Sequence, residues 1–282
     1  MTFTELRSFR RHSRWNKLLR PHSFAERSIA NRRRIYPVRY QHKLSKDLYT
    51  KRDKVVSQIP SFWPLAIEQC PPDIDEYIQP ADANLLLNHL TGLSVERFEL
   101  PNGDPRSVSI KWEFSENEFF ENKTLEKKFW WRNALDKWSG HVSEPVEIKW
   151  KEGKDLTNGM LALSKKIYEE EAAGKTEETE AKKKLKEQID ETGLGSLSFF
   201  AWFGFRGRKI SADEHKEATK KDEERRKNIK AGKKVEEMEE DDDEDDDNDE
   251  YEYEIFPTGD DLAICIAEDL WPNAIKYFSE CT

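Results

Sequence analysis

The sequence predicts an α+β fold with a single folded domain. Three patterns support this prediction: residues at helical spacing near the start, segments that alternate apolar and polar residues in the middle, and further residues at helical spacing near the end. Among the 282 residues, 36% are apolar and 37% are charged. This composition suffices for one core, so we expect segments without a core beside the domain.

The first predicted element is an amphipathic helix over residues 43–60. Its apolar side chains recur at helical spacing on one face, whereas Lys, Arg and Asp occupy the other. The apolar face consists of Leu44, Leu48, Val55, Val56 and Ile59. Pro60 ends the helix, and Pro37 with the preceding arginines is expected to interrupt it upstream, which leaves about twenty helical residues.

The next predicted elements, within residues 61–160, are a short helix and a four-stranded antiparallel meander. The helix covers residues 82–90, and its expected buried side chains are Leu86, Leu87 and Leu90. Alternation of apolar and polar residues then predicts four strands. These strands comprise residues 94–100, 108–114, 125–131 and 146–150. Short polar turns join them, so we expect one buried face that is covered by helices.

The last third of the chain predicts helices of contrasting character. Residues 161–196 are mostly Glu, Lys and Ala and predict a charged helical insertion with little core content. An aromatic cluster, SFFAWF, opens the helical part at residues 197–235 and is expected to anchor the core. Thr258 and Asp261 have the spacing of a capping box and predict a core helix within residues 257–282.

Charge is distributed very unevenly along the chain. Residues 1–50 carry 13 Lys or Arg against 3 Asp or Glu, so residues 51–282, with 34 against 54, have a formal charge of -20. Residues 236–256 form an acidic run, in which mutual repulsion and a lack of apolar side chains predict a solvated, disordered segment. The run either keeps the chain soluble or attracts a polybasic partner. The acidic body opposes strong direct binding of nucleic acid.

Residues 1–42 form a basic arm that we expect to be disordered. Four interpretations of this arm stay open: a nuclear localisation or nucleic-acid-binding patch, a mitochondrial-type presequence, an internal partner for the acidic run, or an artefact of the conceptual translation. A second basic cluster runs from Arg225 to Lys227. It is either a nuclear import signal or part of a solvated helix.

The sequence carries no motif of an enzyme class that we could identify. It lacks a glycine-rich phosphate loop, a GxSxG elbow and an HExxH motif. Six scattered histidines and three widely spaced cysteines, Cys70, Cys265 and Cys281, indicate neither a metal site nor a disulfide framework. No apolar run is long enough for a membrane span. We therefore expect a non-enzymatic protein without cofactor, metal or membrane attachment.

Five short segments occur in a characteristic order. They are LYTKRDKVVSQIPSFW ending at Trp63, NEFFEN from Asn117, IKWKEGKDLT from Ile148, SFFAWF from Ser198 and DLWPNAIKYF from Asp269. Together they resemble the nucleosome assembly protein and SET family of histone chaperones. Their spacing, and the absence of a long insertion in the sheet, make the resemblance closest to the SET-like branch, including its fungal members.

This resemblance implies a long helix that pairs with its twin, an "earmuff" domain of sheet and helices, and core histones bound to an acidic concave surface. Because the helix is expected to be short in this chain, homodimer formation stays open. The implied function is that of a histone chaperone in nucleosome assembly and chromatin remodelling, in the nucleus or shuttling to the cytoplasm. The alternative is a regulatory scaffold that presents histones to an acetyltransferase or inhibits a phosphatase.

The resemblance and the charge pattern together suggest two groups of candidate histone contacts. Those on the sheet and its loops are Glu113, Glu116, Glu118, Glu121, Asp155 and Thr157. Those in the acidic run are Glu239, Glu240, Asp241, Asp242, Asp243, Glu244, Asp245, Asp246, Asp247, Asp249 and Glu250. The candidate dimer contacts are the five apolar residues of the first helix.

Overall fold

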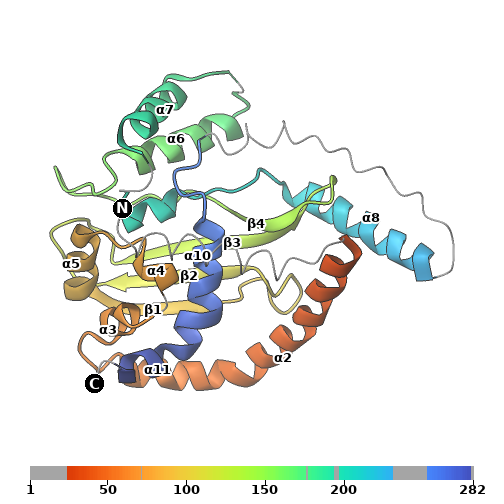
Figure 1. Cartoon of the computed structure of the whole chain (residues 1–282), viewed down its shortest axis with the longest axis horizontal. Coiled ribbons are helices and arrows are strands. Elements are labelled where there is room, and N and C mark those ends of the chain that lie inside the picture. The colour runs from red at the N-terminus through yellow and green to blue at the C-terminus, as the bar shows by residue number, and fades with distance from the viewer. Residues whose placement is uncertain (1–23, 71, 176, 194–196, 231–252, 281–282) are drawn as a thin grey trace, which may run out of the picture.

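The structure is a computed structural model that describes residues 24–70, 72–175, 177–193, 197–230 and 253–280. At its centre lies a four-stranded antiparallel sheet with the strand order β1-β2-β3-β4 (Figure 1). The strands are β1 (Leu90–Glu96), β2 (Val108–Phe114), β3 (Thr124–Asn133) and β4 (Ser139–Ser143). The predicted α+β class and antiparallel meander are confirmed.

One face of the sheet forms the core. Trp112 and Phe129 point toward this face and are at most 1% exposed. The aromatic cluster folds into the short 3-10 helix η1 (Phe199–Gly204), which covers them. Trp202 stacks on Phe129 with ring centroids 5.4 Å apart, and Phe199 meets Trp112 edge-on at 5.3 Å. Because aromatic side chains bury large apolar areas, this cluster is the core anchor that its composition predicts.

The fourth strand lies earlier in the chain than predicted. It is formed by β4, whereas residues 146–150 contribute the isolated bridge between Phe120 and Trp150. Val146, Ile148 and Trp150 do alternate, and they pack on or in the core. Pro145 lacks a main-chain donor just before them, which disfavours a continuous ladder. Alternation therefore identified an extended, half-buried segment, but not its pairing.

Helix α2 (Phe24–Val56) is longer than predicted and continues through Pro37. A proline removes one main-chain donor, but the hydrogen bonds on either side of it remain. Two residues further on, the Arg39 guanidinium donates to the carbonyl oxygens of Pro101 and Gly103 at 2.8 and 2.6 Å, which holds the helix against the sheet domain. The predicted start at residue 43 is therefore wrong, and part of the basic arm is helical.

Three short helices follow α2. They are α3 (Phe62–Glu68), α4 (Pro72–Asp75) and α5 (Pro80–His89). In α5, Leu85 and Leu86 are buried, whereas Leu87 is 52% exposed, which corrects its predicted place on the buried face. The orientation of α5 is fixed by buried Asp82, whose carboxylate accepts a hydrogen bond from Ser198 Oγ at 2.5 Å.

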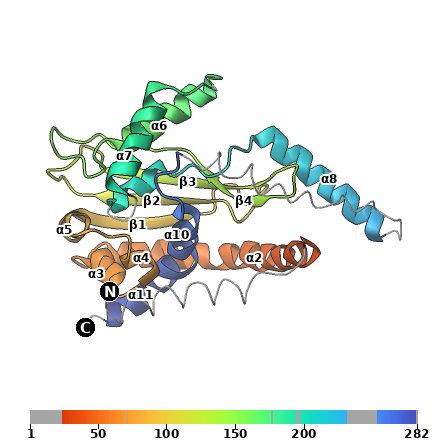
Figure 2. The same cartoon turned by 45° about the horizontal axis from the view of Figure 1, so that its top comes forward.

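Helices α6 (Met160–Ala172) and α7 (Glu180–Thr192) pack against each other on the opposite side of the molecule from α2 (Figure 2). Ile167 and Leu185 are fully buried. The expectation of little core content in this region is therefore wrong, because its few apolar residues are spaced to meet. The Glu171 carboxylate binds Lys182 and Arg206, each at 3.2 Å, and so joins the helix pair to the chain after η1.

The C-terminal part first leaves the domain and then returns to it. Helix α8 (Ala212–Lys230) extends beyond the sheet in both views (Figures 1 and 2). The chain returns through α10 (Gly259–Cys265), a π-helical turn η2 (Ile266–Leu270) and α11 (Trp271–Glu280). The predicted capping box is not formed, because Thr258 Oγ1 instead donates to the Tyr77 hydroxyl at 3.0 Å. No helix in the described part of the chain has the length and apolar character that a membrane crossing requires.

The end of the acidic run is buried. Glu254, Ile255 and Phe256 are 3%, 1% and 6% exposed. The prediction of a solvated segment through residue 256 is therefore wrong for these residues, because Ile255 and Phe256 supply apolar side chains that the core can take up. The run from residue 236 to 252, with all of its candidate histone contacts, lies outside the described residues.

Candidate functional site

The outer face of the sheet carries charged side chains that largely pair with one another. On β2, Lys111 Nζ lies 2.7 Å from a carboxylate oxygen of Glu113, and this hydrogen bond raises the pKa of Lys111. On β3, Lys128 and Glu126 are 3.7 Å apart. Water screens such exposed pairs, so they contribute little to stability and exchange partners at low cost. Glu113, a candidate histone contact, lies on this self-neutralised face.

Asn117 orders the turn between β2 and β3. Its Oδ1 accepts hydrogen bonds from the main-chain N–H groups of Phe119 and Phe120, both at 2.9 Å. Phe120 is thereby directed into the core, while Glu118 and Glu121 on either side of the aromatic pair are exposed. An Asn side chain commonly fixes a turn in this way. The NEFFEN segment thus presents carboxylates on an ordered loop.

Glu116 and Glu121 border a cavity of about 610 Å³ at this turn. Phe114, Phe120 and Lys151 are among the other residues that line it. Within the described part of the chain, neither Glu116 nor Glu121 has a salt-bridge partner. The cavity therefore combines apolar surface with two carboxylates that are free to meet a cation.

The structure brings the β2–β3 turn together with the segment 149–157. The main-chain N–H of Glu121 donates to the carbonyl of Lys149 at 3.0 Å. Glu118 forms an ion pair with Lys154, and this hydrogen bond lowers the pKa of Glu118. The candidate acidic residues of two separate sequence motifs are therefore neighbours at one end of the sheet.

Asp155 and Thr157 organise this second segment from within. Asp155 Oδ1 accepts from the main-chain N–H and the hydroxyl of Thr157, at 2.8 and 2.7 Å, and its Oδ2 accepts from the N–H of Gly159 at 2.9 Å. Thr157 is fully buried, so in this structure it is not available to a partner. Among the described residues, no cluster of three or more His, Cys, Asp and Glu side chains could hold a metal ion.

The apolar residues of α2 divide between two faces. Leu44, Leu48 and Val55 are 60%, 65% and 62% exposed. Val56, by contrast, is 5% exposed and belongs to the core, on which Ile59 also packs. Leu44 and Leu48 are one helical turn apart, so this face of α2 presents apolar side chains to solvent.

Arg52 connects α2 to the C-terminal helices. Its guanidinium lies 4.8 Å from the ring centroid of Tyr49, 5.6 Å from that of Trp63 and 4.5 Å from that of Trp271, and it donates to the carbonyl of Trp271. A desolvated guanidinium over aromatic rings gains cation–π energy. This contact brings together the first and the last of the five family segments, which sequence reasoning had not placed side by side.

A buried lysine is the feature that sequence reasoning missed most clearly. Lys127 Nζ donates to the carbonyl oxygens of Glu144, Phe203 and Phe205, at 2.9, 3.0 and 2.9 Å. Burial lowers its pKa to about 7. The signal was present in the sequence, because residue 127 lies between the inward-facing Leu125 and Phe129 and must share their face of the strand.

The sequence profile of the nucleosome assembly protein family matches residues 25–281, which is nearly the whole chain. Together with the fold, this match defines the class as a protein of the nucleosome assembly type. The chain belongs to the nucleosome assembly protein family, and the family predicted from its sequence is confirmed.

Individual relatives agree with this assignment. Protein SET of Drosophila melanogaster is 36% identical over 123 residues, which is 43% of this chain and 44% of that protein. NAP1-related protein 2 of Arabidopsis thaliana is 29% identical over 237 residues, 84% of this chain and 64% of the relative. The chain thus spans less than two thirds of either relative. The crystal structure of Vps75 matches the fold with a TM-score of 0.55 and 21% identity, covering 90% of this chain and 94% of that one.

Proposed function

We propose that this protein is a histone chaperone that binds basic core histones during nucleosome assembly and acts in the nucleus. The observation that carries the proposal is the family match over residues 25–281. The formal charge of -20 on residues 51–282 supports it, because a surface of this sign attracts and partly neutralises basic proteins. Shielding histones in this way prevents uncontrolled association with DNA. DNA has the higher charge density and later binds the histones that the chaperone releases.

We propose that the ordered part of the histone-binding surface is the β2–β3 turn and the adjoining outer face of β2. Glu116 and Glu121 offer carboxylates without an ion-pair partner in the described residues. Glu113 and Glu118 would exchange their lysine partners for histone cations, since both pairs are exposed. Asp155 supports this surface by shaping the loop, and the acidic run would add electrostatic capture.

The double variant Glu116→Gln, Glu121→Gln tests this surface. Loss of two exposed charges should weaken binding of core histones about tenfold at physiological ionic strength, and the difference should shrink as added salt shortens the screening length below about 8 Å. The matched control is Glu177→Gln, Glu187→Gln, which removes two exposed carboxylates beside or on α7. Equal affinities of the two variants would exclude the turn as the site, and wild-type protein without histone affinity would exclude the proposed function.

We also propose that the exposed stripe of α2 pairs with a second copy of the chain. Leu44, Leu48 and Val55 are each at least 60% exposed, and burial of such side chains drives association. The variant Leu44→Asp, Leu48→Asp should be a monomer by light scattering where the wild type is a dimer. A control at Leu87, also exposed but on α5, should leave the mass unchanged on substitution by Asp. A monomeric wild type would refute this proposal.

A further inference from the structure

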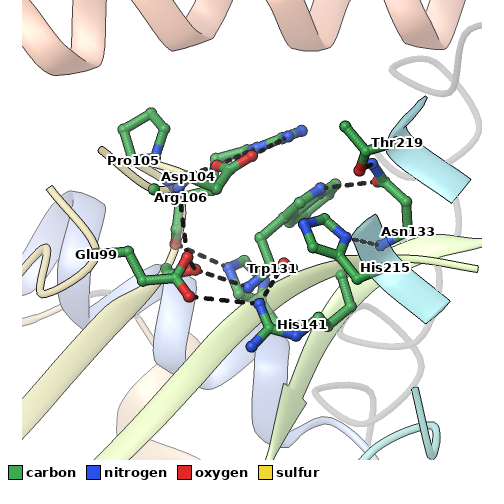
Figure 3. Close-up of polar contacts among 12 residues, drawn as sticks. Glu99, Asp104, Pro105, Arg106, Trp131, Asn133, His141, His215 and Thr219 are labelled. Carbon is green, nitrogen blue, oxygen red and sulfur yellow. Dashed lines mark hydrogen bonds and ion pairs between the residues drawn. The ribbon is translucent and has the colours of Figure 1, made fainter. Parts of the chain in front are cut away.

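Helix α8 is attached to the sheet at its first turns, where Figure 3 shows a network of polar contacts. The main-chain N–H of Asn133, at the end of β3, donates to His215 Nδ1 at 2.9 Å. The Asn133 side-chain amide donates to Thr219 Oγ1 at 3.2 Å. The main-chain N–H of Leu135 donates to a carboxylate oxygen of Glu214 at 3.4 Å. Ala218, on the same side of the helix, is 6% exposed.

These three hydrogen bonds all run in the same direction, from donor to acceptor. In each of them α8 supplies the acceptor and residues 133–135 supply the donor. Because His215 Nδ1 accepts a main-chain N–H, the neutral ring must carry its proton on Nε2. A second proton on Nδ1 would turn that nitrogen into a donor that faces another donor. Protonation of His215 is therefore incompatible with this contact.

The surrounding charges do not compensate for that loss. Arg132 of β3 and Arg106 of the preceding loop both disfavour a second positive charge at His215. Asp104 and Glu99 favour it, but Asp104 holds Arg106 through two bonds of 2.9 and 2.6 Å, and Glu99 lies 3.4 Å from Arg132. On α8 itself, Glu214 is bound to Leu135. Burial, followed by Arg132, lowers the pKa of His215.

Most side chains in the remainder of α8 are exposed. Beyond Thr219, the side chains of Lys220, Lys221, Glu223 and Glu224 are exposed, and Figures 1 and 2 show the helix extending past the sheet. Arg225 and Asp222 make further contacts, but both are only half-buried. These contacts lie beyond the first turns of α8, whose hydrogen bonds to the sheet domain are those with residues 133–135.

We propose that His215 is a proton-operated latch, which docks α8 on residues 133–135 when neutral and releases its first turns when protonated. The acidic run begins at Glu236, six residues after the end of α8. Docking therefore fixes the position of Lys230, the last described residue before this run. Release moves that position away from the sheet while the other end of the run stays attached at Glu254.

Hydrogen exchange of the main-chain amides of α8 tests the latch in the full chain. From about pH 7.5 to about pH 5, the range in which histidines titrate, the wild type should lose at least about tenfold in protection at residues 133–135 and 212–219, after correction for intrinsic exchange. The variant His215→Asn places a non-titrating carboxamide oxygen near the position of Nδ1 and should keep its protection at about pH 5. The control His89→Asn replaces a histidine at the end of α5 and should behave as the wild type does.

Two results would overturn the proposal: a wild type whose protection is the same at both ends of the range, or a His215→Asn variant that loses protection as steeply as the wild type. A second measurement needs no variant. The ring ¹⁵N shifts of His215 in the wild type should show the Nε2–H tautomer near neutral pH. The opposite tautomer would contradict the latch even if the variant failed to fold.

Discussion

The acidic run is attached to the domain in two very different ways. At its start, α8 rests on three hydrogen bonds around a half-buried histidine. At its end, the Glu254 carboxylate is buried and accepts hydrogen bonds from the main-chain N–H groups of Arg206, Gly207 and Phe256, at 2.9, 3.1 and 3.3 Å. Core packing of Ile255 reinforces only the second attachment. We call the attachment at Glu254 the fixed end of the acidic run and the attachment of α8 the adjustable end.

The fixed end also contains opposite buried charges. Lys127 donates to the carbonyl oxygens of Phe203 and Phe205. Glu254 accepts from the main-chain N–H groups of the next two residues, Arg206 and Gly207. The two side chains therefore bind the same short segment, one as donor and the other as acceptor. Burial raises the pKa of Glu254 and lowers that of Lys127, which shows that both charged forms lack water. Such a pair adds little net stability, but loss of one member is costly.

The largest effect should therefore come from Glu254→Ala. This change leaves three main-chain N–H groups without their acceptor and removes the carboxylate that most favours the charged form of Lys127, so the free energy of unfolding should fall by about 3 kcal/mol. Urea unfolding would measure this fall. Glu187→Ala, at an exposed position of α7, should change it by less than about 0.5 kcal/mol. Similar values for the two variants would show that both ends of the run are loosely held.

Replacement of Asp260, in the first turn of α10, should change the free energy of unfolding by a smaller amount and in the opposite direction. Burial and the charge of Asp261 raise its pKa to about 6. A carboxyl group with a raised folded-state pKa loses stability as pH rises from the unfolded value of about 4 to about 6, and the loss persists above that. Asp260→Asn should therefore stabilise the protein by about 1–2 kcal/mol near pH 8, after allowance for partial exposure, and by almost nothing near pH 4.

Thermal or urea unfolding at the two pH values would test this expectation. Asp190→Asn, at an exposed site on α7, is the matched control and should be nearly neutral at both. A stabilisation by Asp260→Asn that is equally large at the acidic pH would contradict an electrostatic origin. Together with Glu254→Ala, the pair of results would show whether the fixed attachment depends on hydrogen bonds or on charge.

Local sequence patterns predicted those parts of the fold that local physics determines. Alternation placed β2 at residues 108–114, as observed, because Ile110 and Trp112 are buried on one face while Glu113 on the other is exposed. The rule that proline ends a helix was wrong at Pro37, where Arg39 makes contacts with residues more than 60 positions away. A contact between residues so far apart in the sequence cannot be predicted from a local pattern.

The same division applies to the candidate site. Glu118 and Glu121 of the NEFFEN segment were predicted as candidate contacts, and they are exposed because Asn117 orders the turn locally. Thr157 was chosen by motif alone and proved to be buried, since its hydroxyl serves Asp155. Residue type shows which group can bind a partner, but tertiary contacts decide whether that group is free.

The smallest change in the free energy of unfolding is expected from Thr219→Val, at the adjustable end. This change keeps the shape of the side chain and removes the acceptor for the Asn133 amide, so the free energy of global unfolding should fall by less than about 1 kcal/mol. Because α8 opens locally through few contacts, amide protection in its first turns should nevertheless fall about threefold. The control Thr192→Val, at an exposed position on α7, should leave α8 unchanged. If Thr219→Val lowered global stability as much as Glu254→Ala does, then α8 would be part of the cooperative core, and the two attachments would not differ.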